Sequence, residues 1–197
     1  MQDQLNKNVN RYLSYVIGRL SSITRYSTRK FIIRQTVMEH IGDVAFISMV
    51  LSEYLNNHGV RNDSGRVIKL ALIHDVPEAI SGDLPHDSKY DYGEVSRGLR
   101  KQLEGLEKIT MNYALAKLND KKTASAVYSL FEEYNARKTI ESKIVKLADL
   151  YDVILYTQQE MSMGNKSLHT EYRNTKREFN ALMKSVCGES KAARAPA

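Results

Sequence analysis

The stretch HDVPEAISGDLP, residues 74–85, is the most informative part of this sequence. It begins with a histidine and an aspartate side by side, His74 and Asp75. An isolated histidine, His40, precedes the stretch, and an isolated aspartate, Asp149, follows it, each in a segment with the apolar spacing of a helix. Two imidazoles and two carboxylates are enough to hold one divalent metal ion, so this pattern makes an otherwise plain helical sequence a candidate hydrolase.

Apolar residues recur at helical spacing along most of the chain. Near the N-terminus they form one helical face from Tyr12 to Leu20, and Asp63 or Ser64 is suited to cap a later helix that continues to Leu72. The spacing predicts further helices over about 39–57, which we expect to be largely buried, and over about 92–118, 123–134, 140–163 and 168–186.

The breaks between these segments complete the fold prediction. Gly82 to Tyr92 is predicted to be a loop, and Gly164-Asn165 is predicted to end a helix. Only Phe31-Ile32-Ile33 resembles a strand. We therefore expect an all-α fold with a single compact domain over residues 1–187, followed by a flexible tail of small and polar residues, 188–197.

Composition narrows the class of protein. The chain has 197 residues, 42% of them hydrophobic and 26% charged, as in an ordinary globular protein of one domain.

No apolar run approaches the roughly 20 residues that a membrane span needs, and the N-terminus does not have the pattern of a signal peptide. The single cysteine, Cys187, cannot form an internal disulfide, so we expect a cytoplasmic protein. The net charge of +6 is spread along the chain, so we do not expect nucleic acid as the partner.

The donor types indicate which metals would bind. Imidazole nitrogen together with carboxylate oxygen suits Co²⁺, Mn²⁺, Zn²⁺, Fe²⁺ or Ni²⁺ better than Ca²⁺. Adjacent residues such as His74 and Asp75 cannot share a face in the middle of a helix, but they can at a helix end, and Pro77 is compatible with such a break. Taken alone, the pair also fits a buried, hydrogen-bonded histidine beside a helix-capping aspartate.

Three motifs together resemble a known family. They are Glu39-His40, the stretch from His74 to Pro85 with Glu78 and Gly82-Asp83, and Lys146-Leu147-Ala148-Asp149. The chain resembles the HD-domain phosphohydrolases, and among them the YfbR-like 5′-deoxynucleotidases, from about Arg25 to Asp152. The resemblance implies an HD-domain helical bundle and one divalent metal ion bound by His40, His74, Asp75 and Asp149.

The resemblance also implies roles for residues around the metal. Glu78 would orient or deprotonate the attacking water or protonate the leaving oxygen, and Asp83 would bind the 3′-hydroxyl of a deoxyribose. Arg25 would bind phosphate, and Tyr26 would pack beside the base or sugar, where the family members in question carry tryptophan. Lys89 is a candidate for a second positive charge near phosphate.

Asp152 lies three residues after Asp149 and shares its helical face, so it is suited to support a metal ligand.

The resemblance implies a 5′-deoxynucleotidase, in which water attacks the phosphorus of a 2′-deoxynucleotide and releases a deoxynucleoside and phosphate. One alternative is a deoxynucleoside triphosphate triphosphohydrolase like the phage-encoded dATPases, which the basic residues Arg29, Lys30 and Arg34 would suit. A second is a non-catalytic HD protein with a binding or regulatory role. A binuclear phosphodiesterase would need more histidines than His86 between His74 and Asp149. Members of the family are usually dimers or larger, so the resemblance also implies a homo-oligomer.

Overall fold

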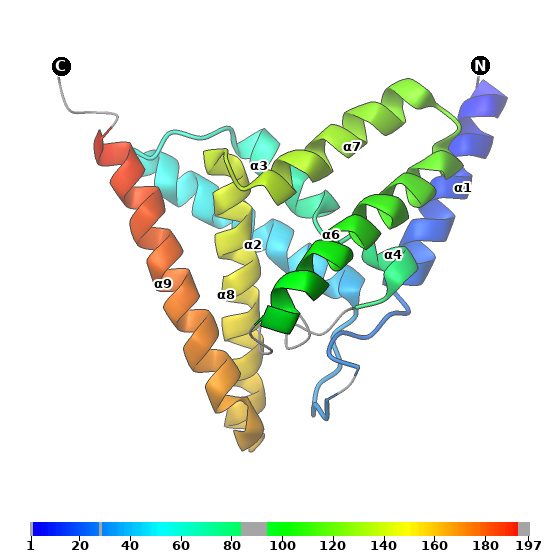
Figure 1. The fold of residues 1–197 in the computed structure, drawn as a ribbon. Coiled ribbons are helices and arrows are strands. Elements are labelled where there is room, and N and C mark those ends of the chain that lie inside the picture. The colour runs from blue at the N-terminus through cyan, green and yellow to red at the C-terminus, as the bar shows by residue number, and fades with distance from the viewer. Residues whose placement is uncertain (1, 28, 84–93, 193–197) are drawn as a thin grey trace. The chain divides into compact units, whose positions relative to one another are not determined.

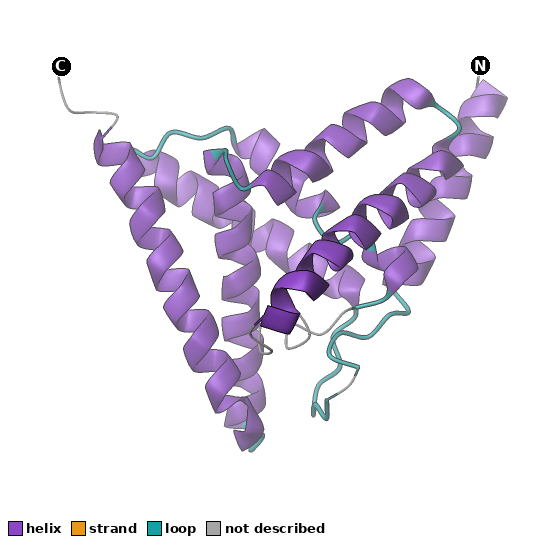
Figure 2. Cartoon of the chain, viewed as in Figure 1, coloured by secondary structure: helices purple, strands orange, loops and turns teal. Residues whose placement is uncertain are grey.

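The computed structural model describes residues 2–27, 29–83 and 94–192, and in these ranges it is helical (Figure 1). The described residues form no strand, and their only extended pairing is an isolated bridge between Thr24 and Thr36 (Figure 2). The predicted all-α class is therefore confirmed. The elements are α1 Gln2–Leu20, α2 Val37–Asn57, α3 Ser64–Ile73, α4 Glu78–Ser81, α6 Glu94–Leu115, η1 Ala116–Leu118, α7 Lys121–Ala136, α8 Ile140–Ser162, η2 Lys166–Leu168 and α9 His169–Ala192.

Capping residues explain several helix boundaries. Asp63 is the N-cap of α3 and accepts a hydrogen bond from the Arg66 amide at 3.0 Å, and Thr139 caps α8 in the same way. Helix α8 ends at Ser162, and Gly164 follows with φ at 106°, a backbone conformation that favours glycine. These boundaries agree with the predicted ones.

Other boundaries differ from the sequence predictions. Helix α9 continues to Ala192, past Val186 and through Gly188, because an interior glycine lowers the stability of a helix without necessarily ending it. Phe31-Ile32-Ile33 is not a strand. Most of the predicted loop from Gly82 to Tyr92 lies outside the described residues.

The contacts divide the chain into two compact units, and each unit consists of two separate pieces of sequence. Unit 1 comprises Met1–Glu39 and Asp75–Ser129, and unit 2 comprises His40–His74 and Leu130–Ala197. The chain therefore passes from one unit to the other directly before His40 and directly after His74. The division into a domain of residues 1–187 and a tail of residues 188–197 stays a prediction.

Unit 2 is built around α8. Helix α8 packs against α3 and α9, and α8 and α9 lie side by side in Figure 1. Its buried core draws on every long helix of the unit: Val44 and Leu55 from α2, Val67, Leu70 and Ala71 from α3, Tyr134 from α7, Ile144, Val145, Leu147 and Ala148 from α8, and Val186 from α9. This apolar packing fixes the positions of α2, which carries His40, of α3, whose C-cap is His74, and of α8, which carries Asp149.

Helix α2 is less buried than its sequence predicts. Val44 and Leu55 are buried, but Phe46, Val50 and Tyr54 are 65%, 51% and 58% exposed. These three residues are four positions apart and share one side of the helix, away from the buried stripe. The prediction of a largely buried helix was wrong because α2 carries apolar residues on two sides and buries only one.

Unit 1 places α1 against α4, α6 and η1. Val16 and Leu20 of α1 are buried, as are Ala79 of α4 and Met111 of α6. The side chain of Arg19 donates a hydrogen bond from Nε to the Ala79 carbonyl, which ties α1 to α4. In the part of the chain that the structure describes, no helix combines the length and the hydropathy needed to cross a membrane.

A capping box precedes α2 and His40. Glu39 Oε2 accepts hydrogen bonds from the Thr36 amide at 2.6 Å and from the Thr36 hydroxyl at 2.9 Å, and the Glu39 amide donates to the same hydroxyl at 3.2 Å. These hydrogen bonds lower the pKa of Glu39, the one from the Thr36 amide most strongly. The box fixes the first turn of α2, in which His40 lies.

We expect Thr36→Ala to lower the free energy of unfolding by about 1 kcal/mol and the Tm by about 2–4 °C, because the variant loses the side-chain half of the box. Thermal unfolding followed by circular dichroism measures the change. Thr36→Ser keeps the hydroxyl and should unfold close to the wild type. An unchanged Tm in Thr36→Ala would show that the box does not stabilise α2.

Candidate metal centre

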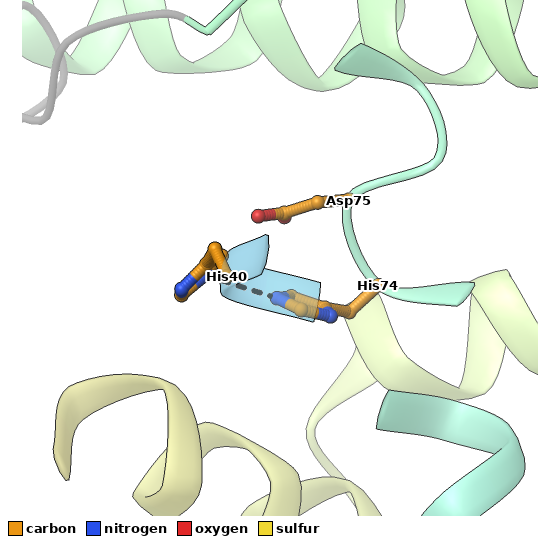
Figure 3. A group of neighbouring side chains, drawn as sticks. All are labelled: His40, His74 and Asp75. Atoms are coloured by element: carbon orange, nitrogen blue, oxygen red, sulfur yellow. Dashed lines mark hydrogen bonds between the residues drawn. The ribbon is translucent and has the colours of Figure 1, made fainter. Parts of the chain in front are cut away.

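His74 and Asp75 lie where α3 ends. His74 is the C-cap of α3, and the Asp75 carbonyl accepts a hydrogen bond from the Glu78 amide at 3.0 Å in the turn that leads into α4. Each of His40, His74 and Asp75 offers one ligand atom, and these three atoms lie within 4.8 Å of one another (Figure 3). The predicted helix break is therefore present, and it lets two adjacent side chains point toward the same space.

The His40 ring lies at the centre of this group and is fully buried. Its Nδ1 is 2.7 Å from Asp152 Oδ2, and its Nε2 is 3.3 Å from His74 Nε2 and 3.4 Å from Asp149 Oδ1. His74 Nδ1 is 2.6 Å from the carbonyl oxygen of Ala71. The structure thus places His74 Nε2 and Asp149 Oδ1, both of unit 2, within 3.4 Å of His40 Nε2.

The hydrogen-bond partners decide which nitrogen of each ring carries hydrogen. A carboxylate and a backbone carbonyl only accept hydrogen bonds, so Nδ1 of His40 and Nδ1 of His74 are the donors. In the neutral rings, both Nε2 atoms are then acceptors. Two acceptor nitrogens face one another at 3.3 Å, and the Asp149 carboxylate oxygen lies 3.4 Å from that of His40, an arrangement that only a proton or a metal cation would stabilise.

The spacing of these donor atoms fits a divalent cation. Ligand atoms about 2.1 Å from one ion, at bond angles of about 90–110°, lie about 3.0–3.4 Å apart. The distance between the two Nε2 atoms is 3.3 Å, and the distance from His40 Nε2 to Asp149 Oδ1 is 3.4 Å. Both nitrogen and oxygen donors are present, as transition metals prefer.

Asp149 is held in its charged form. Burial alone would raise the pKa of its carboxyl group, but the Lys146 ammonium and the neighbouring His40 and His74 rings together outweigh burial and hold this pKa well below its usual range. Lys146 Nζ is 2.9 Å from Asp149 Oδ2, and the two side chains are 21% and 16% exposed. Burial lowers the pKa of Lys146, but the charges of Asp149, Tyr134 and Glu178 together raise it by more, so the ammonium stays charged.

Sequence reasoning did not single out Lys146 or Tyr134. Lys146 was quoted only as part of a motif, although a lysine three residues before an aspartate on one helix is a recognisable signal for an ion pair. The Tyr134 ring lies edge-on to the His74 ring, with the ring centroids 5.4 Å apart. The guanidinium carbon of Arg137 lies over the Tyr134 ring, 3.3 Å from its centroid. No spacing in the sequence indicates these ring contacts.

Three of the predicted substrate residues lie together in unit 1. The Tyr26 amide donates a hydrogen bond to Asp83 Oδ2 at 2.5 Å, and the guanidinium carbon of Arg25 is 4.9 Å from the centre of the Tyr26 ring. Arg25 also donates to Gln35 Oε1 at 2.9 Å, and the Tyr26 ring stacks on Phe31. Sequence reasoning missed the contacts of Gln35 and Phe31.

Tyr26 has a φ of 55°, which is uncommon for a residue with a bulky side chain. Its hydrogen bond to Asp83 helps to hold this conformation, and such conformations cluster at binding sites. Glu78 is the first residue of α4, whereas Lys89 lies outside the described residues.

Residues 11–188 match a family model described as 5′-deoxynucleotidase YfbR-like. The chain belongs to this family. It is 27% identical to a 5′-deoxynucleotidase of Vibrio cholerae over 177 residues, which cover 89% of this chain and 86% of that protein. It is also 27% identical to a 5′-deoxynucleotidase of Dictyostelium discoideum over 188 residues, which cover 89% of this chain and 94% of that one.

Solved structures show the same fold. An HD-domain phosphohydrolase of Listeria innocua superimposes with a TM-score of 0.72 at 20% identity, over 93% of this chain and 90% of that chain. A conserved hypothetical protein of Pyrococcus furiosus superimposes with a TM-score of 0.69 at 26% identity, over 92% of this chain and 98% of that chain. The predicted HD-domain fold of this YfbR-like protein is therefore confirmed.

The ion pair between Lys146 and Asp149 predicts a pH-dependent stability. A carboxyl group whose pKa is lowered by folding stabilises the fold above its unfolded pKa, and this stabilisation is lost as the pH falls through the folded value. Lys146→Met removes the charge that lowers the pKa of Asp149 most, so burial then raises that pKa. We expect the variant to lose about 3 kcal/mol of unfolding free energy at pH ~7.5 and less at pH ~4.5.

Urea unfolding of metal-free protein at the two pH values measures this difference. Lys184, exposed on α9, provides the matched control, and Lys184→Met should change little at either pH. An equal loss in Lys146→Met at both pH values would contradict a role for the charge pair.

Proposed function

We propose that this protein is a metal-dependent 5′-deoxynucleotidase that converts a 2′-deoxynucleoside 5′-monophosphate and water into a deoxynucleoside and phosphate. The observation that supports this most is the pair of facing Nε2 atoms beside the Asp149 carboxylate, in a chain that belongs to the YfbR-like family. Its relatives from Vibrio cholerae and Dictyostelium discoideum are both named 5′-deoxynucleotidases.

The metal ligands in this proposal are His40, His74, Asp75 and Asp149. Their mixed nitrogen and oxygen donors suit Co²⁺, Mn²⁺, Zn²⁺, Fe²⁺ or Ni²⁺. A divalent ion bound there supplies positive charge that acidifies a water molecule and polarises a phosphoryl oxygen. His40 and His74 could bind the ion through Nε2 without first losing a proton, because each ring carries its hydrogen on Nδ1, where Asp152 and the Ala71 carbonyl accept it.

Glu78 moves the protons in this proposal. It is the first residue of α4, and its amide donates a hydrogen bond to the Asp75 carbonyl at 3.0 Å. The Glu78 carboxylate therefore follows the proposed metal ligand Asp75 by one turn of the backbone. In the reaction, a bond forms between a water oxygen and phosphorus, and the bond from phosphorus to the 5′ oxygen breaks. A carboxylate that accepts the proton of the water and returns it to the 5′ oxygen balances this step.

Arg25, Tyr26 and Asp83 bind the substrate in this proposal. The planar guanidinium of Arg25 would pair with phosphate oxygens, and Asp83 would accept a hydrogen bond from the 3′-hydroxyl. The observed contacts of Tyr26 with Arg25 and with Asp83 support this grouping, because they join the phosphate side to the sugar side of one nucleotide site. Lys89 is proposed as a further phosphate ligand, and it lies outside the described residues.

A longer phosphate chain is the second candidate substrate. The loop that carries Arg25 also exposes Lys30 and Arg34, and these two charges would suit a triphosphate. The product then separates the two functions, because a triphosphohydrolase releases tripolyphosphate instead of phosphate.

The homo-oligomeric state and the cytoplasmic location stay predictions.

The proposed function predicts phosphate release from deoxynucleoside monophosphates. Protein with Co²⁺ or Mn²⁺ is incubated with each deoxynucleoside mono- and triphosphate and with the matching ribonucleotides, and the products are separated by chromatography. We expect phosphate and deoxynucleoside from the deoxynucleoside monophosphates. Tripolyphosphate from a triphosphate such as dATP would instead establish the second candidate. No turnover of any nucleotide would contradict both and leave a non-catalytic HD protein.

The same assay tests Glu78. We expect Glu78→Gln to lower kcat by about 10²–10⁴-fold, because the amide cannot exchange a proton, while metal content stays at the wild-type level. Glu104, exposed on α6, provides the control, and Glu104→Gln should keep wild-type kcat. A Glu78→Gln variant with wild-type kcat would remove Glu78 from the mechanism.

The ligand set predicts metal binding near one ion per chain. We expect His74→Gln to weaken binding of Mn²⁺ or Co²⁺ by more than about 100-fold, since it removes a direct donor. Equilibrium dialysis followed by metal analysis measures the affinity. His169, exposed at the start of α9, provides the control, and His169→Gln should bind metal like the wild type. Equal affinity in both variants would contradict the assigned site.

A further inference from the structure

Helix α8 carries Lys146, Asp149 and Asp152 at successive intervals of three residues. Lys146 pairs with Asp149, whose other oxygen faces His40. Asp152 is only 4% exposed, and the next two residues of the helix, Val153 and Ile154, belong to the apolar core. A buried carboxylate is costly unless it forms strong hydrogen bonds, so the role of Asp152 needs an explanation.

The His40 ring provides one strong partner. Asp152 Oδ2 lies 2.7 Å from His40 Nδ1, although the two residues are 112 positions apart in the sequence. The His40 ring has no exposed surface. The contact has the length of a charge-assisted hydrogen bond, and it reaches the nitrogen of His40 that faces away from His74 and Asp149.

We propose that Asp152 is a positioning residue that sets the tautomer of His40. It keeps hydrogen on Nδ1 and so keeps the lone pair on Nε2, toward His74 and Asp149. The proposal rests on the proposed function, in which a metal ion uses that lone pair. In the opposite tautomer, the Nδ1 lone pair would face the Asp152 carboxylate, and hydrogen would occupy Nε2, where a metal ligand must be bare.

The two histidines differ in how their tautomers are held. A backbone carbonyl, that of Ala71, accepts from Nδ1 of His74, so a side-chain substitution does not remove this hydrogen bond. His40 relies on a side chain, so Asp152 can be changed without touching the His74 bond. This difference makes His74 an internal reference for the effect of Asp152 on His40.

Nitrogen NMR of the imidazole rings tests the proposal in metal-free protein at pH ~8, where histidines are mostly neutral. His40→Gln assigns the His40 signals by their loss. We expect wild-type His40 to show a protonated Nδ1 and a bare Nε2. In Asp152→Asn, the amide can turn its NH₂ toward Nδ1 and favour hydrogen on Nε2, so the His40 signals should move toward the other tautomer while those of His74 stay.

Metal affinity provides the second measurement. We expect Asp152→Asn to weaken Mn²⁺ or Co²⁺ binding by about 10–100-fold, as substitutions behind a metal-ligating histidine do. Asp152→Glu keeps the carboxylate and should keep the His40 tautomer of the wild type. Glu132, exposed on α7 in the same unit, provides the matched carboxylate-to-amide control, and Glu132→Gln should change neither the tautomer nor the affinity.

Wild-type His40 signals and wild-type affinity in Asp152→Asn would overturn the proposal. So would equal changes at His40 and His74, since they would indicate a general loosening of the unit. The NMR measurement requires neither metal nor turnover. A wild-type protein that fails to hydrolyse deoxynucleotides would therefore refute the proposed function without deciding the role of Asp152.

Discussion

The hydrogen bonds behind His40 and His74 are the constraint on which the rest of the site depends. A neutral imidazole has one donor nitrogen and one acceptor nitrogen, so fixing the donor side also fixes where the lone pair points. Asp152 and the Ala71 carbonyl accept hydrogen bonds from Nδ1 of His40 and of His74. The two acceptor nitrogens, both Nε2, then face each other at 3.3 Å. The core of unit 2 keeps these partners in place, because α8 packs against α3, which carries Ala71 and has His74 as its C-cap.

Much of the fold could be predicted because its signals are local. The caps at Asp63 and Thr139 and the turn at Gly164 act within a few residues of the boundaries they set. The burial of α2 could not be predicted in the same way. Phe46 and Val44 are both apolar and two positions apart, and only the packing of other helices decides which one is covered.

In the candidate site, too, local patterns could be predicted from the sequence and long-range contacts could not. His74-Asp75 was recognisable because its residues are adjacent, and Asp152 because it is one helical turn from Asp149. The approach of Asp152 to His40 and that of Asp83 to Tyr26 join residues 112 and 57 positions apart, and no local pattern contains them. Family resemblance supplied the grouping of the ligands, whereas the contact of Asp152 with His40 and that of the Ala71 carbonyl with His74 came only from the three-dimensional structure.

The interrupted sequence of unit 2 has a consequence for how such proteins can recombine during evolution. His40 and His74 lie in one piece of this unit, and Asp149 and Asp152 lie in the other, with a piece of unit 1 encoded between them. A genetic crossover anywhere in that intervening piece would combine the histidines of one parent with the helix α8 of another. Hybrids between diverged relatives would then inherit a compatible partner for His40 only when the parent that supplies α8 has an acidic side chain at position 152.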